Sequence, residues 1–195
     1  VAEAYFANVA KVAEKKPTIL GHFDLIKKIN GDGKFFDEND PRYTAAANAE
    51  TLFADAAYPL IDRTKANLPP LLWKPTARWV ASLAKPVAPT AALDLVPTGK
   101  PGQLKVVFHG APLPKAKVEL VSPSGWAREA TSGDDGTVTF ALPWTGQYVA
   151  EVKHSDKTPG EAQGQKYGEV SHLITLSFVQ AEGMASPAMP AGHAH

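Results

Sequence analysis

All six histidines of this 195-residue chain are candidate ligands for a divalent metal ion. Imidazole nitrogen binds nickel, cobalt, zinc and copper, and the chain has no cysteine to supply a thiolate ligand. The six candidates are His22, His109, His154, His172, His193 and His195.

Three of these histidines belong to segments that the sequence predicts to be strands. His109 and His154 each end a predicted strand, and His172 lies in the last one. Two such side chains that meet at one edge of a sheet can bind a divalent ion through their imidazole nitrogens. An ordinary surface role for each histidine is the alternative.

Acidic residues between His154 and His172 can complete such a site. Asp156, Glu161 and Glu169 lie in the polar segment 153–172, and carboxylate oxygens are common partners of imidazole at a metal ion. A long polar connection between two strands is the simpler interpretation of this segment. At the C-terminus, His193 and His195 stand two residues apart and can chelate nickel, copper or zinc weakly; an incidental pair is the alternative.

The composition excludes several classes of partner. Lysine plus arginine and aspartate plus glutamate each total 20, so the formal net charge is zero, which gives no support for binding to nucleic acid. No apolar run approaches the roughly 20 residues of a membrane-spanning helix. The chain starts without an initiator methionine or a signal peptide, and we expect a processed chain or a fragment.

The first part of the chain, residues 1–67, has the pattern of helix, strand and helix. Residues 2–16 carry apolar side chains at helical spacing, and residues 18–26 form a short apolar run typical of a buried strand. A second helix is expected from Asp40-Pro41 to Ile61, because Leu52, Ala56 and Leu60 recur every four residues. Residues 68–90 are rich in proline and are expected to be a connector between domains.

Residues 91–180 have the pattern of a β-sandwich. Seven short segments alternate or are β-branched, and turn residues separate them about every 10 residues. Asp135-Gly136 is expected to form a tight turn with a positive φ. The expected fold is therefore mainly β, a seven-stranded antiparallel sandwich preceded by an α-helical part, with a disordered tail at 181–195. The seven segments are 91–97, 102–110, 116–123, 126–132, 137–143, 146–154 and 171–180.

Three motifs in this part resemble those of transthyretin-like and carboxypeptidase-regulatory β-sandwiches, so the expected sandwich is immunoglobulin-like or transthyretin-like. They are a Gly-x-Pro-Leu hairpin, an Asp-Gly hairpin followed by Phe-x-Leu-Pro, and a Gly-x-Tyr strand. The matching positions are Gly110, Pro112, Leu113, Ala116, Val118, Asp135, Gly136, Phe140, Leu142, Pro143, Gly146, Tyr148 and Val152.

More narrowly, the strings LLWKPTARWVASL and ALDLVPTGKPGQLKVVFHGAPLP resemble a bacterial periplasmic family of largely unknown function. Some of its members are described as accessory proteins of nickel or cobalt uptake. The resemblance covers roughly residues 68–180. It implies a periplasmic or secreted protein with a non-enzymatic role, whose partner is another protein or a subunit of a membrane complex.

The stretch TILGHFDLIKKINGDGKFFDENDPRY resembles a segment of histidinol phosphatases of the polymerase-and-histidinol-phosphatase (PHP) superfamily. Those enzymes are distorted (β/α) barrels with a cluster of metal ions, and the match, over roughly residues 1–57, implies that His22 is a metal ligand. The family's N-terminal His-x-His pair and its late Asp-x-His are missing from this chain. Because several ligands are needed to hold paired ions, we expect no phosphatase activity from this chain alone.

A calcium-binding loop is a further alternative for the Asn-Gly-Asp-Gly sequence in this stretch. Aligning Gly33 with the invariant glycine of an EF-hand puts Lys28 and Asn39 at the first and last ligand positions. A lysine repels the cation, and asparagine cannot replace the bidentate glutamate, so a tight turn is the better interpretation.

Three functional hypotheses follow from the sequence. The first is an exported, non-enzymatic binding or structural module that binds a divalent metal through histidines. The second is part of a metal-dependent phosphoesterase whose missing ligands come from another chain. The third is an assembly module without a metal.

Overall fold

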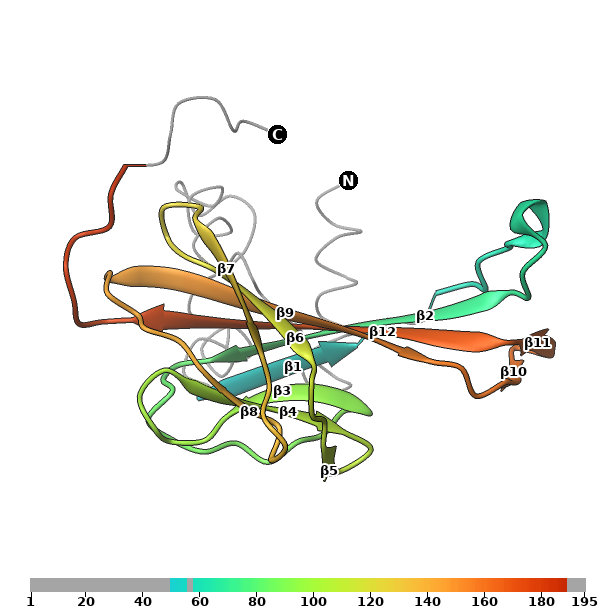
Figure 1. The fold of residues 1–195 in the computed structure, drawn as a ribbon, viewed down its shortest axis with the longest axis horizontal. Coiled ribbons are helices and arrows are strands. Elements are labelled where there is room, and N and C mark those ends of the chain that lie inside the picture. Colours follow the sequence, from blue (N-terminus) through green and yellow to red (C-terminus); the bar gives the residue numbers. More distant parts are fainter. Residues whose placement is uncertain (1–49, 56–57, 189–195) are drawn as a thin grey trace, which may run out of the picture.

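The computed structural model describes residues 50–55 and 58–188, and these residues form two packed β-sheets (Figure 1). The larger sheet has six strands in the order β1-β2-β12-β9-β6-β7. Their bounds are β1 Thr51–Asp55, β2 Leu71–Val80, β12 Glu169–Gln180, β9 Gly146–Asp156, β6 Lys117–Val121 and β7 Ala127–Thr131.

The smaller sheet is built around β4, which pairs with β3, β5 and β8. A separate two-stranded hairpin joins β10 to β11, and one short 3-10 helix, η1, precedes β2. The bounds are β3 Leu93–Pro97, β4 Gln103–Phe108, β5 Ala111–Pro112, β8 Thr137–Thr139, β10 Gly160–Ala162, β11 Gln165–Tyr167 and η1 Thr64–Ala66.

The core fills the space between the two sheets because the strands alternate apolar and polar residues. Every second residue of β9, from Tyr148 to Val152, is buried, and each pairs with a buried residue of β12. Burying a valine, leucine, isoleucine or phenylalanine side chain, such as Val152 or its partner Ile174, contributes about 1.5–3 kcal/mol. The inner faces of β4 and β6 add further buried aliphatic residues, among them Leu104, Val106 and Val118.

Three long strands of the larger sheet project beyond the smaller sheet. In Figure 1, β2, β12 and β9 continue to the right past β3 and β4, and β10, β11 and η1 lie at their far end. We call this projection the arm. The inner face of the arm is the side of β2, β12 and β9 that faces the core, in the part of these strands that lies past the apolar core. The second sheet does not cover all the side chains on this face.

Strands occur in all seven segments where the sequence predicts them, and the described chain is mainly β, like a sandwich. The prediction of a wholly antiparallel arrangement is wrong. β2 runs parallel to β12 along ten residue pairs, so the larger sheet is mixed, and both sheets are open. A parallel pair requires a long crossover, and here the chain between β2 and β12 builds the whole second sheet before it returns.

The predicted helix from residue 40 to 61 is wrong where the structure describes it. Residues 51–55 are strand β1, which pairs with β2 from Thr51↔Val80 to Asp55↔Thr76. Leu52 is buried on this strand, so pairing and burial override the helical preference of the alanine-rich segment. The other helix and strand predicted for residues 2–49 lie outside the described residues, and the described remainder of this part contains no α-helix.

The proline-rich segment 68–90 is not an irregular connector throughout, because it contains strand β2. Pro75 lies within this strand, and the strand continues on both sides of it. The β1–β2 ladder ends at the pair Asp55↔Thr76, and the next bridge on that side is Ile61↔Leu71, so Pro75 lies where β2 has a described partner only on the β12 side. A proline is tolerated at such a position, since no ladder hydrogen bond among the described residues is lost.

The start of the tail is attached to the body of the molecule rather than disordered. The Met184 N–H donates to the Pro143 carbonyl at 2.8 Å, and the Thr145 N–H donates to the Met184 carbonyl at 2.8 Å. Residues 189–195 lie outside the described part.

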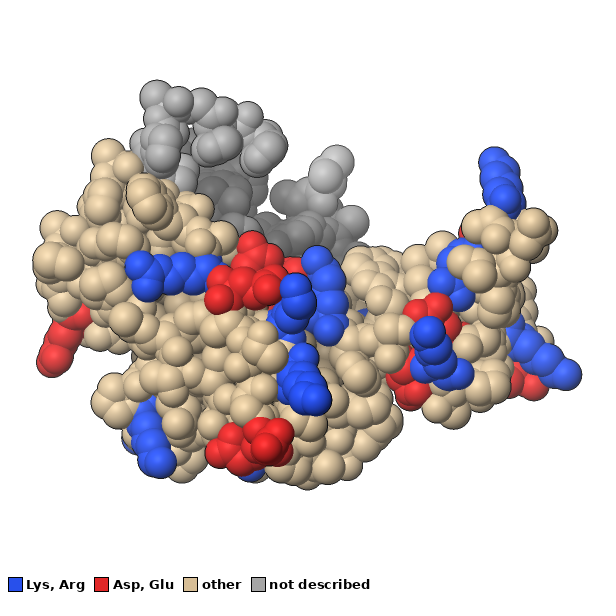
Figure 2. All heavy atoms as spheres, in the orientation of Figure 1, with Lys and Arg blue, Asp and Glu red and all other residues tan. Residues whose placement is uncertain are grey.

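On the face shown in Figure 2, charged side chains of both signs are interspersed. Within residues 50–55 and 58–188, no helix is long and apolar enough to cross a membrane.

Candidate functional site: a histidine cluster beneath the arm

A row of polar side chains crosses the inner face of the arm where the apolar core ends. His154 of β9 pairs with His172 of β12, and His172 pairs with Lys74 of β2. Since side chains alternate along a strand, this row lies on the same face as the buried pair Val152↔Ile174, one step further along. The sheet therefore continues its core-facing pattern with two histidines and a lysine.

Phe108 brings a third histidine to this row. The centroid of the Phe108 ring lies 4.5 Å from that of the His154 ring and 5.3 Å from that of the His172 ring. His109, the next residue in the chain, has its ring 4.2 Å from Phe108 and 6.5 Å from His172. Three of the six predicted histidines thus meet at one end of the two-sheet core, and we call them the histidine cluster.

The backbone at His109 is held in an unusual conformation. Its φ is +49°, in the left-handed region, and its N–H donates to the Ala92 carbonyl at 2.7 Å. A left-handed residue directly after β4 turns the chain sharply, and this turn places the His109 ring beside Phe108. The His109 side chain is exposed, whereas His154 is half-buried.

His172 is the buried member of the cluster, with 5% of its surface exposed. Burial lowers the pKa of His172 to about 4, and the nearby positive charge of Lys74 acts in the same direction, against a smaller opposing effect of Asp156. At neutral pH its imidazole is uncharged. The uncharged ring is the form that binds metal ions.

Of the three acidic candidates, Asp156 is the one whose charge acts on His172. It pairs with Val170 on the inner face, one step beyond His154. Hydrogen bonds from Thr158, to which the charges of His172 and His109 add, lower the pKa of Asp156 and keep it ionised.

Glu169 is engaged elsewhere. The Arg63 Nη1 donates to Glu169 Oε2 at 2.8 Å, and the Ser155 hydroxyl donates to the other carboxylate oxygen. Hydrogen bonds from Ser155 and Arg63 lower the pKa of Glu169. These bonds tie the start of β12 to η1, which is a structural role in the arm.

The described residues contain no group of three histidine, aspartate or glutamate side chains already arranged around a single metal position. The cluster consists of imidazole rings gathered around Phe108 rather than pointing at one centre. Three candidates lie outside the described residues: His22, His193 and His195. The Asn-Gly-Asp-Gly sequence and residues 1–49 of the PHP-like match also lie outside them.

A cavity of about 470 Å³ adjoins the cluster and shares His172 with it. Its walls come from the end of β1, the first half of β2, the segment Thr90–Leu93 and the β10–β11 hairpin. We call it the arm cavity. No sequence motif marks this cavity, because residues 153–172 have the pattern of a polar connection between two strands. The sequence signal for the hairpin is Gln163-Gly164, both with positive φ, which form its tight turn.

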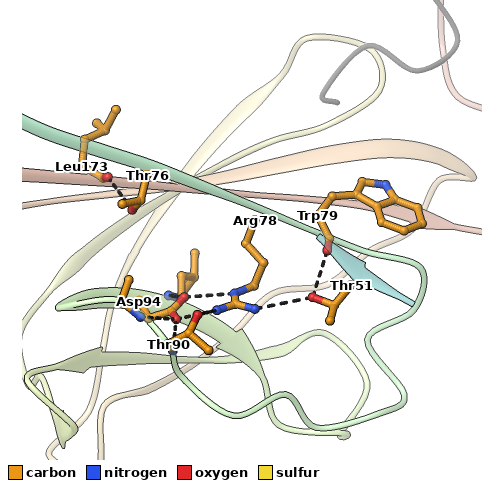
Figure 3. A network of polar contacts seen from close by, with 9 residues as sticks. Thr51, Thr76, Arg78, Trp79, Thr90, Asp94 and Leu173 are labelled. Carbon is orange, nitrogen blue, oxygen red and sulfur yellow. Dashed lines mark hydrogen bonds and ion pairs between the residues drawn. The ribbon is translucent and has the colours of Figure 1, made fainter. Parts of the chain in front are cut away.

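A buried ion pair holds one wall of this cavity in place (Figure 3). Arg78 of β2 donates from Nη2 to Asp94 Oδ2 at 2.6 Å and from Nε to Oδ1 at 3.0 Å. The same carboxylate accepts the backbone N–H groups of Thr90 and Ala91, at 2.8 and 3.2 Å. The segment before β3 is therefore fixed against β2. The sequence does not reveal this pair, because nothing local marks Arg78 and Asp94 as partners.

Residues 74–156 match the profile of a protein family described as a domain of unknown function (DUF4198). The matched segment includes β3 to β9 and most of β2, and it contains His109, His154 and Asp156 but not His172. No curated protein and no solved structure matches the chain significantly.

Proposed function

We propose that this protein is an exported, non-enzymatic binding module of the transthyretin-like, immunoglobulin-like type, and that it binds a divalent transition metal at the histidine cluster. The observation that carries the proposal is the convergence around Phe108 of His154 from β9, His172 from β12 and His109 from the turn directly after β4. Nickel, cobalt, zinc and copper are the ions that fit imidazole ligands.

The spacing of the rings supports this proposal. A metal about 2.0–2.1 Å from a ring nitrogen lies about 3 Å from the ring centre, so two ligating imidazoles have centroids about 5–6.5 Å apart. The His109 and His172 centroids are 6.5 Å apart, at the upper end of this range. Because His109 is exposed, its side chain can rotate toward a metal without disturbing the core.

The electrostatics of the cluster favour a cation as well. His172 is uncharged at neutral pH, so it adds no repulsion, and Asp156 supplies one negative charge beside the rings. Phe108 contributes an apolar wall, which strengthens the attraction between the ion and its ligands by excluding water. Export is proposed on the resemblance of residues 68–180 to a periplasmic family, and fractionation of the producing cells checks it.

Calorimetric titration of the purified chain with nickel and zinc tests the metal proposal. We expect one ion per chain, with affinity lost by at least about tenfold in His154→Ala and in His109→Ala. His154 and His109 are not fully buried, so both variants should fold. Exposed Lys117→Gln, on β6, is the matched control. Equal affinity in all four proteins would contradict the proposal and favour an assembly module without a metal.

A further inference from the structure

The arm cavity has three charged side chains on its walls, one positive and two negative. Lys74 comes from the floor on β2, Asp55 from the end of β1, and Glu161 from β10. Asp55 pairs with Thr76, so it stands diagonally to Lys74 on the same face of the sheet. Within the described residues, none of the three forms an ion pair with another charged side chain.

This combination of charges restricts the ligand that the cavity can accept. An anion would gain from Lys74 but would meet two carboxylates, and a simple cation would meet the ammonium group of Lys74. An unpaired charge that is covered by a ligand costs free energy unless it finds an opposite charge. A ligand with one positive and one negative group pairs with both kinds of wall and leaves no such cost.

The remaining walls are aromatic and apolar. Phe53 and Tyr167 line this space, and Phe53 lies on the same face of the sheet as Asp55 and Lys74. The floor contains Leu72, which is buried. Binding sites for small organic molecules combine such walls with a few polar groups that fix orientation.

The volume sets the size of the ligand. A cavity of about 470 Å³ falls in the range of about 300–1,000 Å³ that is typical of sites for small organic molecules. It is larger than a single metal ion or a water cluster needs, and it is too small for a folded partner.

We propose that the arm cavity binds a small zwitterion, an amino acid or a short peptide with both ends ionised. Lys74 binds the carboxylate, Asp55 and Glu161 bind the amine, and the aromatic walls contact the side chains of the ligand. The charged groups of this site, Lys74, Asp55 and Glu161, are not ligands in the proposed metal site, and His172 is the residue that the two sites share. The failure of one proposal therefore does not decide the other.

Calorimetry with the tripeptide Ala-Phe-Ala and two blocked derivatives tests this proposal in metal-free protein. We expect the free tripeptide to bind one per chain, and N-acetylation or C-terminal amidation each to weaken binding by about tenfold, as the loss of one ion pair predicts. Lys74→Gln should weaken the free peptide but not the amidated one further. The double variant Asp55→Asn with Glu161→Gln should weaken the free peptide but not the acetylated one further.

Lys74, Asp55 and Glu161 are exposed, so these variants should fold, and Lys117→Gln with Glu129→Gln, an exposed pair on β6 and β7, is the matched control. The proposal is overturned if the tripeptide does not bind, if both blocked peptides bind as well as the free one, or if the variants bind it like the control. Tighter binding of a diamine or a dicarboxylate of the same length would also overturn it.

Discussion

Arg78 and Asp94 form a two-pronged ion pair between the two sheets, at 2.6 and 3.0 Å, with 2% and 0% of their surfaces exposed. Arg78 belongs to β2 of the larger sheet and Asp94 to β3 of the smaller one. Further bonds from Arg78 to Thr90 and Thr51, and its position 5.2 Å above the Phe53 ring, extend the contact to β1. The pair therefore fixes the sheets to each other beside the arm cavity.

Replacing Asp94 by asparagine should cost about 3–5 kcal/mol of unfolding free energy, because it leaves the buried Arg78 charge without a counter-charge. Urea unfolding followed by tryptophan fluorescence measures this loss. Glu129→Gln breaks the exposed pair with Lys117 and serves as the control, with an expected change below about 1 kcal/mol. Equal stability of the two variants would show that the Arg78–Asp94 pair contributes no more than a surface pair.

His172 should make stability depend on pH in a defined window. Its pKa in the folded chain is about 4, below the ordinary value of 6.5, so the unfolded chain binds the proton more readily. The stability contribution is complete above pH 6.5 and is lost as the pH falls toward 4, by up to about 1.4 kcal/mol per pH unit.

Urea unfolding at several pH values between 7 and 4.5 measures this slope, and His172→Gln should flatten it. Lys74, His154, His109 and Asp156 surround the ring and remain in the variant, so the difference between the two curves isolates His172. Parallel curves would mean that His172 is as easily protonated in the fold as in the unfolded chain.

Gly136 and Gly110 form a matched pair for a test of the hairpin turns. Both have positive φ, +76° and +81°. A Cβ at Gly136 would lie 2.6 Å from the Val106 carbonyl oxygen, whereas a Cβ at Gly110 meets nothing within 4 Å. Gly110→Ala should therefore cost about 1–2 kcal/mol for the left-handed backbone alone, and Gly136→Ala clearly more. Thermal unfolding of the two variants compares them, and a larger loss at Gly110 would contradict the structure.

Truncation after Ala188 should leave nickel affinity within about twofold of the full chain. The truncation removes His193 and His195 but keeps Met184, whose backbone bonds to Pro143 and Thr145 attach the tail. Calorimetric titration of both proteins measures the change. A large drop in affinity would move the site from the histidine cluster to the C-terminal pair.

The sequence predicted the strands of residues 91–180 because each has a local signal, such as the alternation of Tyr148, Ala150 and Val152 or the turn at Asp135-Gly136. It failed at β1 and β2. There the local signals, alanine spacing in β1 and proline in β2, are outweighed by strand pairing. β2 pairs with β12, a strand about 100 residues away in the chain, and β1 pairs with β2. A segment that becomes a strand because it pairs with a distant strand need not show the alternating apolar pattern of a strand in its own sequence.

The same distinction applies to the candidate site. Residue type alone identified His109, His154 and His172 as candidates. The alternation of apolar residues before His154 and after His172 indicates that these two side chains lie on the core-facing side of their strands. Their meeting at Phe108 depends on how the two sheets pack and could not be predicted from the sequence. The arm cavity depends on the β10–β11 hairpin and on the Arg78–Asp94 pair. The turn at Gln163-Gly164 marks the hairpin in the sequence, but no local pattern shows where the hairpin lies or that Arg78 and Asp94 are partners.

The most direct measurement of the central proposal is NMR of the histidine ring nitrogens during titration with zinc. All six histidines report separately, so the spectra show which imidazoles bind the ion. The account predicts that ring nitrogens of His109, His154 and His172 shift together and that the shifts end at one zinc per chain. Shifts confined to His193 and His195, or no shift at one equivalent, would contradict it.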